Sequence, residues 1–577
     1  MTGCLGRPAM HKDVSVAPPS EQINTSHGEI SMQLQSRLLT VAIVSALAAS
    51  APALAGKFDS SAAIRAQGLI DGPAARAVRR APADAFKAGA VTVDAKGTEH
   101  VRFTRTYRGL PVIGGDFVLH SRNGQLKGVS QTLRTNARPG VVPQVSARRA
   151  IVEAGARFGS SFTGVPTSRL VVYALGRAPV LAHEVIFAGM KSDQTPTNMH
   201  YFIDAHTGKV LNQWDDVQTA VPGPDGNTTC AGAVTRAGSG KSLSEGSVNF
   251  YTIKCGTRYQ MKDLTRGGGY TTNMGMRTSG MGAIFVDTDN KWGTGALSNS
   301  QTAAVDAHYG VSKTWDYYKN VHGRLGIDGE GTGARSQVHY GRNYFNAFWN
   351  DNCYCMTFGD ADNGASLNPF VALDVAGHEM SHGVTSRTAD LVYSGESGGL
   401  NEANSDIFGT MVEFYTNNPN DKPDYLIGEK LYAHNTGTQA LRYMFKPSLD
   451  GASPDCYASD LGNLNVHYSS GVANHFFYLL AEGAVVPEGF GDGTSANLTR
   501  ASLVCNGNTA ITGIGRAAAE KIWYGALTNY MTSGTTYADA RNATLSSAVD
   551  LYGMGSAQYN AVIAAWDAVS VSGIAPL

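Results

Sequence analysis

The chain has 577 residues, of which 42% are hydrophobic and 16% charged. This composition is typical of several globular domains with a large core, and it excludes an intrinsically disordered protein. The formal net charge of −1 gives no basic surplus, so we expect neither nucleic acid nor an anionic membrane surface as a partner.

An export signal is predicted inside the chain rather than at its first residue. Met32 is followed by Arg37, by the apolar run 38–49 and by Ala53-Leu54-Ala55, the order of a signal peptide with a small-residue cleavage site. We therefore assign 32–55 to a signal peptide and 1–31 to a misassigned N-terminal extension, and we expect a secreted, extracellular protein. The apolar run is too short for a membrane anchor, and no other stretch is long enough to be one.

The region from 56 to about 215 is predicted to be rich in strands. Alternating side chains favour strands at 101–107, 201–204 and 210–211, and 147–158 is predicted as a helix with Ser146 as its N-cap. A linker rich in proline and glycine follows at 221–226.

Two further regions follow the linker. Residues 227–350 mix strands, glycines and aromatics with one predicted helix at 302–320. From 369 onward the chain is predicted to be mostly helical, with helices at 370–387, 401–416, 468–483, 514–531, 536–551 and 556–569. A β-rich lobe followed by an α-rich lobe predicts a cleft between them.

Six of the seven cysteines follow the signal, and an even number in an exported chain predicts three disulfides. Fifteen pairings are possible, and local order favours Cys230–Cys255, Cys456–Cys505 and a small ring between Cys353 and Cys355. A metal site at Cys353-Tyr354-Cys355 is the alternative, although no nearby Cys or His completes a ligand set.

The stretch His378-Glu379-Met380-Ser381-His382 carries the chemistry. Two histidines at i and i+4 share one helix face and can reach one cation, and a catalytic Zn²⁺ takes three protein ligands and leaves a position open for water. Glu402 supplies the third ligand, and Glu379 is placed to take a proton from the water. A buried helix that carries this pentapeptide by chance is the alternative, and the acidic motif twenty residues later argues against it.

The spacing of the ligands has two consequences. No histidine follows in 383–388, so the third ligand must come from a separate helix. Asp406 lies one turn after Glu402 and could accept the spare N–H of His378, which would fix its tautomer; an ordinary surface acid is the alternative.

Five motifs together resemble the thermolysin family of neutral metalloproteases, in particular the disulfide-bearing branch of vibriolysin and pseudolysin. They are 346–350 (NAFWN), 374–379 (DVAGHE), 399–402 (GLNE), 466–471 (VHYSSG) and 513–516 (GIGR). The resemblance implies an α+β fold, with a two-lobed zinc metalloprotease behind an α+β propeptide. The implied segments are an FTP-like part at 56–135, a PepSY-like part at 136–218, a β-rich lobe at 219–375 and a helical lobe at 376–577.

The resemblance also implies roles for individual residues. Tyr393 and His467 would hold the oxyanion. Asn346 and the carbonyl of Ala347 would hold the peptide backbone, and Arg442 would bind a substrate carbonyl. An apolar S1′ pocket, with a preference for bulky apolar residues at P1′, would be lined by Val375, Ile427, Leu431 and Leu441.

Four acids fit a calcium site, since hard oxygen ligands suit Ca²⁺. They are Asp374, Glu413, Asp424 and Glu429. The resemblance places calcium behind the zinc helix, and because Leu426 stands where a two-calcium site needs an acid, we expect one ion. Solvated surface acids are the alternative.

One position departs from the family pattern. Where the related branch has an aspartate beside the catalytic histidine, this chain has Asn465. An asparagine oxygen can accept the second N–H of His467 but adds no charge, and Asp460 could substitute if its loop folds back.

The sequence thus predicts a secreted zinc endopeptidase made as a proenzyme, with one catalytic Zn²⁺ and one structural Ca²⁺. Its expected partners are peptide and protein substrates and its own propeptide, acting as inhibitor and chaperone, and the mature enzyme is expected to be a monomer. A non-catalytic zinc-containing scaffold is the alternative, and the intact Glu379 argues against it.

Overall fold

The computed structural model describes residues 60–159, 162–216, 229–435 and 437–573. The predicted N-terminal extension, the signal peptide and the linker at 221–226 lie outside these residues. Among the described residues, no helix is both long and apolar enough to cross a membrane.

The predicted propeptide is built on one nine-stranded sheet with the order β5-β4-β2-β3-β6-β7-β8-β9, and β1 pairs with β2. A parallel pairing of β3 with β6 joins its two halves into one sheet. The elements are α1 (Ser60–Asp71), β1 (Asp84–Val93), β2 (Glu99–Tyr107), β3 (Leu110–Ile113), β4 (Phe117–Arg122), β5 (Gln125–Gln131), α2 (Ala147–Phe158), β6 (Phe162–Tyr173), β7 (Val180–Met190), β8 (Pro196–Asp204) and β9 (Val210–Asp215).

The predicted helix at 147–158 is confirmed as α2. It begins where expected because the side chain of Ser146 accepts a hydrogen bond from the amide of Arg149. Helix α1 was not predicted. Its apolar side chains pack with those of β1, β2 and β4 in one cluster, so burial against the sheet stabilises it.

The β-rich lobe has a five-stranded and a six-stranded sheet, with the long helix α3 (Ser300–His322) packed against strands of both. The first sheet contains β10 (Val234–Lys241), β11 (Ser247–Cys255), β12 (Arg258–Gln260), β16 (Val286–Asp287) and β17 (Lys291–Trp292). The second contains β13 (Lys262–Asp263), β14 (Gly269–Asn273), β15 (Ala283–Ile284), β18 (Arg335–Tyr340), β19 (Ala347–Asn350) and β20 (Cys355–Gly359).

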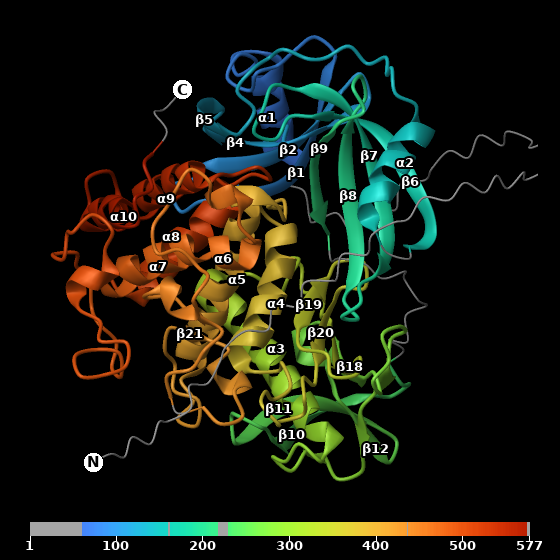
Figure 1. Cartoon of the computed structure of the whole chain (residues 1–577), viewed down its shortest axis with the longest axis vertical. Helices are drawn as coiled ribbons and strands as arrows, with labels where there is room; N and C mark the ends of the chain where they lie inside the picture. Colours follow the sequence, from blue (N-terminus) through green and yellow to red (C-terminus); the bar gives the residue numbers. More distant parts are fainter. Residues whose placement is uncertain (1–59, 160–161, 217–228, 436, 574–577) are drawn as a thin grey trace, which may run out of the picture. The chain divides into compact units, whose positions relative to one another are not determined.

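The helical lobe follows, and it confirms the expected α+β, two-lobed architecture. Its elements are α4 (Leu373–Ser386), α5 (Gly395–Thr416), β21 (Leu426–Ile427), β22 (Arg442–Tyr443), α6 (Val466–Ser469), α7 (Gly471–Glu482), α8 (Arg516–Asn529), α9 (Tyr537–Tyr552) and α10 (Ala557–Ala568). Figure 1 shows α4 between the β-rich part and the other helices. The three favoured disulfides are also confirmed.

The predicted start of the helix at 401–416 was wrong, because α5 begins six residues earlier, at Gly395. The added turns contain glycines that packing requires. A Cβ on Gly398 would lie 2.4 Å from a methyl carbon of Val466, and one on Gly399 would lie 2.5 Å from Oγ of Ser469. Close packing against α6 therefore outweighs the low helix propensity of glycine.

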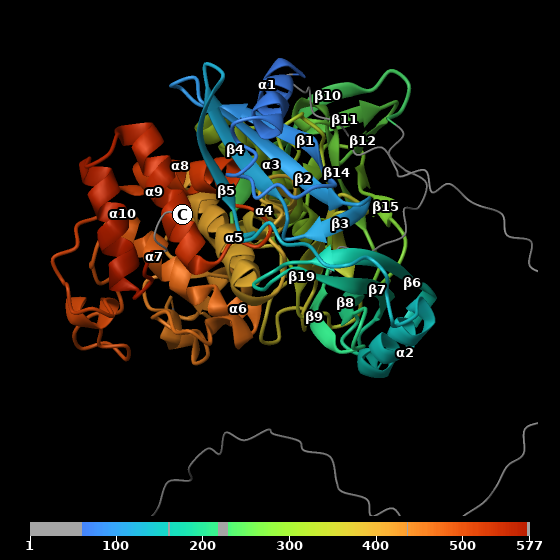
Figure 2. The same cartoon turned by 90° about the horizontal axis from the view of Figure 1, so that it is seen from above.

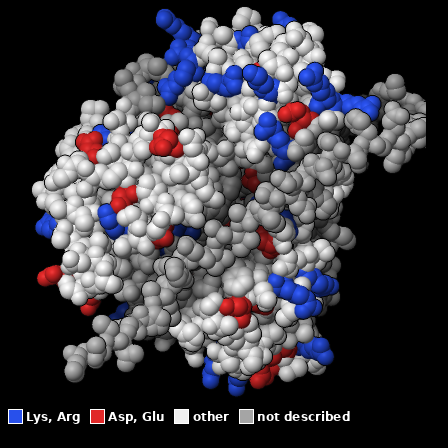
Figure 3. All heavy atoms as spheres, viewed as in Figure 1, with Lys and Arg blue, Asp and Glu red and all other residues white. Residues whose placement is uncertain are grey.

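The predicted propeptide lies against both of the lobes that follow it (Figures 1 and 2). On the helical lobe, Thr92 bonds to Asn529 (2.7 Å), and Lys96 donates to the carbonyl of Val549 (2.8 Å). On the β-rich lobe, the side chain of Gln194 donates to the carbonyl of Arg342 (2.7 Å). In the view of Figure 3, lysine and arginine side chains gather over the propeptide.

Candidate active site

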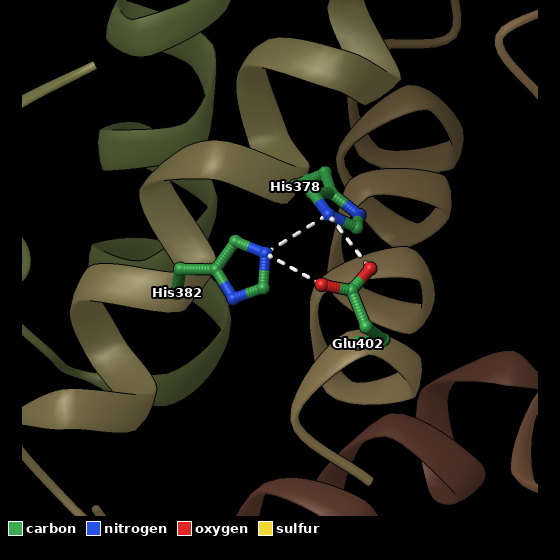
Figure 4. Close-up of side chains that lie close together, drawn as sticks. All are labelled: His378, His382 and Glu402. Carbon is green, nitrogen blue, oxygen red and sulfur yellow. Dashed lines mark hydrogen bonds and ion pairs between the residues drawn. The ribbon is translucent and has the colours of Figure 1, made fainter. Parts of the chain in front are cut away.

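Three side chains from two helices converge in the cleft (Figure 4). His378 and His382 project from α4 with their Nε2 atoms 3.0 Å apart, and Glu402 faces them from α5. Its carboxylate oxygens lie 3.5 Å from Nε2 of His378 and 3.4 Å from Nε2 of His382. Oε2 of Glu402 is buried and accepts no hydrogen bond. Two facing ring nitrogens and an unpaired carboxylate oxygen at these separations fit one Zn²⁺, with about 2.0–2.2 Å to each ligand.

A close approach of α4 and α5 brings these ligands together. A Cβ on Gly377 would lie 2.9 Å from Cα of Gly409, and one on Gly409 would lie 2.5 Å from the carbonyl oxygen of Asp374. Larger residues at either position would separate the helices, and thus Glu402 from the two histidines. The glycines are visible in the sequence, but their pairing across two helices is not.

Each histidine is oriented through its other ring nitrogen. Nδ1 of His378 lies 2.8 Å from Oδ1 of Asp406, and Nδ1 of His382 lies 2.8 Å from Oδ1 of Asn401. Asp406 thus lies within hydrogen-bond distance of His378, where the sequence predicted an acceptor for the spare N–H. If both Nδ1 atoms donate, both Nε2 atoms present lone pairs to the space beside Glu402.

Asp406 is the centre of a buried network that sequence reasoning only partly found. Its carboxylate also accepts two hydrogen bonds from Arg442, at 2.8 and 2.6 Å, and one from Asn474. Burial by itself would raise the pKa of Asp406, but the charge of Arg442 and the contact with His378 outweigh burial and hold this pKa below its usual range. The expected substrate contact of Arg442 therefore has to coexist with this ion pair.

The acids of the cleft differ strongly in pKa. Burial raises the pKa of Glu379 to about 7, which suits a group that takes and returns a proton near neutral pH. Burial would also raise the pKa of Glu402, but the charges of His467, His382 and His378 outweigh burial and lower it to about 2. Glu402 is thus held as a carboxylate, the form that binds a cation.

Tyr393 and His467 belong to two different segments of the chain and lie next to each other in the cleft. The hydroxyl of Tyr393 donates to Oε1 of Glu402 and lies 3.4 Å from Nε2 of His467. Oδ1 of Asn465 lies 2.9 Å from Nδ1 of His467, so Asn465 fills the position for which Asp460 was the alternative. Packing within the cleft lowers the pKa of His467, and Glu402 acts in the opposite direction.

The cleft opens into a cavity of about 910 Å³. From the enzyme side it is lined by most of the predicted substrate-binding residues, namely Asn346, Ala347, Val375, Ile427, Leu441 and Arg442. The prediction that Leu431 lines this pocket is corrected, because its side chain is fully buried in the core of the β-rich lobe. The short helical turn at Glu429–Leu431 turns it inward, beneath Gly428.

Propeptide residues line the same cavity from the other side, among them Thr195, His200, Trp214 and Asp216. The hairpin between β7 and β8 anchors this cover. The hydroxyls of Thr195 and Tyr344 lie 3.0 Å apart, and the side chain of Gln194 accepts from the amide of Arg342 (2.9 Å). Residues of the predicted propeptide therefore cover the cleft in the full-length chain.

A second group of acids lies behind α4. Asp374, Glu413 and Glu429 place their carboxylate oxygens within 4.8 Å of one another. Both oxygens of Glu413 and one of Glu429 are buried without a hydrogen-bond partner. Burial and mutual repulsion raise the pKa of Glu413 and Glu429 well above the usual range. Such uncompensated carboxylates fit a Ca²⁺ ion.

The fourth predicted acid, Asp424, accepts from the amide of Leu426 (2.7 Å) and adds its charge to the repulsion at Glu413 and Glu429. Sequence reasoning missed Asp421, which acts on the same acids and pairs with Lys430 at 3.1 Å. Its position in the loop between Glu413 and Asp424 was the available signal. The ammonium of Lys430 supplies a positive charge beside these acids.

Three family models match this chain. The thermolysin metallopeptidase catalytic domain matches 237–386, the thermolysin metallopeptidase alpha-helical domain matches 389–571, and the fungalysin/thermolysin propeptide motif matches 84–133. The chain belongs to the thermolysin metallopeptidase family. It is a zinc metalloendopeptidase made with a propeptide.

Two relatives match most of this chain, and one solved structure is similar to part of it. A transglutaminase-activating metalloprotease of Streptomyces mobaraensis is 47% identical over 83% of this chain and 60% of its own length. Thermolysin of Bacillus sp. (strain EA1) is 38% identical over 83% of this chain and 84% of its own length. The solved precursor of protealysin from Serratia proteamaculans is 30% identical, with a TM-score of 0.41 over 53% of this chain and 87% of that one.

Proposed function

We propose that His378, His382 and Glu402 hold the catalytic zinc of this peptidase and that Glu379 is its general base. The observation that carries the proposal is the convergence of two histidine ring nitrogens and one unpaired carboxylate oxygen beside a glutamate whose pKa is about 7. Zinc bound there supplies Lewis-acid chemistry, polarising the scissile carbonyl and making a water molecule more acidic.

The protein side chains move the proton and hold the developing charge. Glu379 takes the proton of the attacking water and delivers it to the leaving amine. Tyr393 and His467 donate to the carbonyl oxygen as it becomes negative. In comparable sites, each preorganised donor of this kind contributes about 3–4 kcal/mol to transition-state stabilisation. For this step, the hydroxyl of Tyr393 leaves its hydrogen bond to Glu402 and donates to the carbonyl oxygen of the substrate.

The substrates we propose are extended peptides. Asn346 and Ala347, at the start of edge strand β19, offer an amide side chain and a backbone carbonyl to the peptide. Val375, Ile427 and Leu441 form an apolar wall of the cavity, which supports a preference for bulky apolar residues at P1′. We further propose that the protein is secreted, because of the signal pattern at 32–55, and that the mature enzyme is a monomer.

We propose that the propeptide inhibits the enzyme until it is removed. The tip of the β7–β8 hairpin is fixed to the β-rich lobe by Gln194 and Thr195, and Asp116 fixes β4 to the helical lobe by accepting from the amide of Ser533 (2.9 Å). These contacts support simultaneous attachment to both lobes, which also suits a folding chaperone. We assign one structural Ca²⁺ to the acids around Glu413.

Casein hydrolysis separates an enzyme from a zinc-containing scaffold. We expect hydrolysis by the mature chain to be blocked by a zinc chelator and restored by added zinc, with calcium held constant. Mature protein that binds zinc but leaves casein intact would favour the scaffold.

Processing of the precursor is expected to be carried out by its own active site. The cut should fall between 219 and 233, because β10 begins at Val234 and pairs with β11 along its whole length, while a protease needs an extended, accessible backbone. Precursor carrying Glu379→Ala, expressed without other proteases, should stay intact by mass spectrometry. Normal maturation of that variant would refute self-cleavage.

Asn465→Asp should shift the alkaline limb of kcat/KM to higher pH, by roughly one unit, because a carboxylate 2.9 Å from Nδ1 would favour the protonated imidazole of His467. The protonated, positively charged form of His467 would then persist to higher pH. Asn508→Asp, on an exposed loop, adds the same charge elsewhere and serves as the control. Superimposable pH profiles for the parent and Asn465→Asp would show that His467 is not the titrating group.

A further inference from the structure

A third set of potential metal ligands lies where the propeptide meets the helical lobe. Asp94 follows β1, His100 lies on β2, and Asp550 lies in the last turn of α9. One ligand atom from each falls within 4.8 Å of the others. Figures 1 and 2 both place the first strands of the propeptide beside the C-terminal helices, with the close contacts described above. The set therefore spans the two parts that processing separates.

Hydrogen bonds orient each carboxylate of this set. Oδ1 of Asp94 accepts from the amides of Lys96 (2.8 Å) and Thr98 (2.7 Å), while its Oδ2 is buried and has no hydrogen-bond partner. Oδ2 of Asp550 accepts from the hydroxyl of Tyr530. In both residues one oxygen is fixed by the protein, as partners around a metal site commonly fix ligating carboxylates.

His100 is held in the same way. Only 2% of its surface is exposed, and its Nε2 is buried without a hydrogen-bond partner, 3.8 Å from Oδ2 of Asp94. Its Nδ1 lies 2.8 Å from Nδ1 of His120, whose Nε2 lies 2.8 Å from Oγ of Ser130. If His100 donates to His120 and His120 donates to Ser130, a lone pair on Nε2 faces the carboxylates.

Two negatively charged side chains lie close together at this place. Burial lowers the pKa of His100, even though Asp550 and Asp94 act to raise it. Burial also lowers the pKa of His120 well below its usual value. Lys96 donates to the carbonyl of Val549. Two carboxylates, one of them near the negative end of the α9 dipole, thus lie beside an imidazole whose Nε2 has no hydrogen-bond partner, an arrangement that a cation would stabilise.

We propose that Asp94, His100 and Asp550 bind a divalent transition-metal ion, with Zn²⁺ as the probe, which clamps the propeptide to the helical lobe. One imidazole and two carboxylates form a set that accepts Zn²⁺, with water at a fourth position. The separation between His100 and Asp94 is close to those between the histidines and Glu402 in the active site. Because the propeptide supplies two ligands, the site exists only while the propeptide is docked.

The clamp has a consequence for activation. Cleavage of the linker leaves the propeptide bound by the metal and by surface contacts, so its release is slower when the metal is present. This site is separate from the catalytic ligands, which lie on α4 and α5, and removal of its residues leaves those ligands intact.

Zinc stoichiometry of the full-length precursor tests the proposal. The precursor carries Glu379→Gln to keep the chain uncut, and calcium is held at saturation. After equilibrium dialysis we expect two zinc ions per chain, falling to one with either Asp550→Asn or His378→Ala and to none with both. The control His206→Gln, at an exposed propeptide turn, should keep two. The proposal would be overturned by a single zinc ion in the precursor with Asp550 intact, or by two zinc ions in the Asp550→Asn variant. Loss of one zinc ion with His378→Ala reports separately on the catalytic site.

Thermal unfolding distinguishes loss of the clamp from misfolding. In zinc-free buffer, Asp94→Asn and Asp550→Asn should unfold at or above the midpoint of the parent precursor, because each removes one of two facing negative charges. The zinc-dependent rise in midpoint should be larger in the parent than in either variant, since binding to the native state stabilises it. An equal rise in all three would overturn the proposal. If one variant has a lowered midpoint in zinc-free buffer, the other variant is used for the comparison. The two variants remove ligands from opposite sides of the interface.

Discussion

Glu379→Ala should lower kcat/KM for peptide hydrolysis by about 10²–10⁴-fold or more, while the mature enzyme keeps one zinc per chain. The reason is that Glu379 lies beside the converging ligands but is not one of them, and its pKa of about 7 fits proton transfer rather than permanent charge. Hydrolysis is measured with a fluorogenic peptide and zinc by elemental analysis. The mature variant is released from its precursor with tagged parent enzyme, which is then removed.

Glu488→Ala serves as the matched control, because Glu488 is an exposed glutamate in the same lobe. It should leave both activity and zinc content unchanged. Glu402→Ala should instead lose zinc and activity together, since it removes a ligand. If Glu379→Ala had the activity of the parent in a preparation free of tagged enzyme, Glu379 would not be the general base.

Calcium removal should lower the thermal midpoint of the mature enzyme by about 5–10 °C without releasing zinc. At one hundred times its dissociation constant, a bound ion stabilises the native state by about 2.7 kcal/mol, and each kcal/mol shifts the midpoint of a large domain by about 2–4 °C. Without the ion, Asp374, Glu413 and Glu429 face one another in a buried place. Calorimetry with and without calcium, at constant zinc, measures the difference.

The pH dependence gives a second measure of the same site. Burial raises the pKa of Asp374 and of Asp424 to about 6. An acid whose pKa is raised on folding stabilises the native state at pH values below its unfolded pKa, near 4, and this contribution is lost as pH rises through the folded value. The midpoint of the calcium-free enzyme should therefore fall between pH 4 and 7, and saturating calcium should remove most of that fall.

Glu413→Gln tests the assignment of the ion, with Glu488→Gln as the exposed control. The first change should abolish most of the calcium-dependent rise in midpoint, and the second should leave it intact. Equal midpoints of the parent with and without calcium would exclude the site.

Local patterns in the sequence determined the elements and much of the chemistry. The i, i+4 spacing places His378 and His382 on one face of a helix whatever the rest of the chain does, because helical geometry depends only on neighbouring residues. The cap at Ser146 and the six paired cysteines were also recognisable, since each depends on residue type and short spacing. The motifs then placed Glu402, Tyr393 and His467 by resemblance.

Only the tertiary structure decided which of these residues act together. Gly377 and Gly409 let α4 and α5 touch, Asp421 adds its charge to the acids at Glu413 and Glu429, and Leu431 turns into the core. The set of Asp94, His100 and Asp550 joins residues more than four hundred positions apart, and none of them stands in a recognisable motif. Such contacts depend on how distant elements pack. Packing follows from the combined shape and burial of many side chains, which short spacings along the chain do not encode.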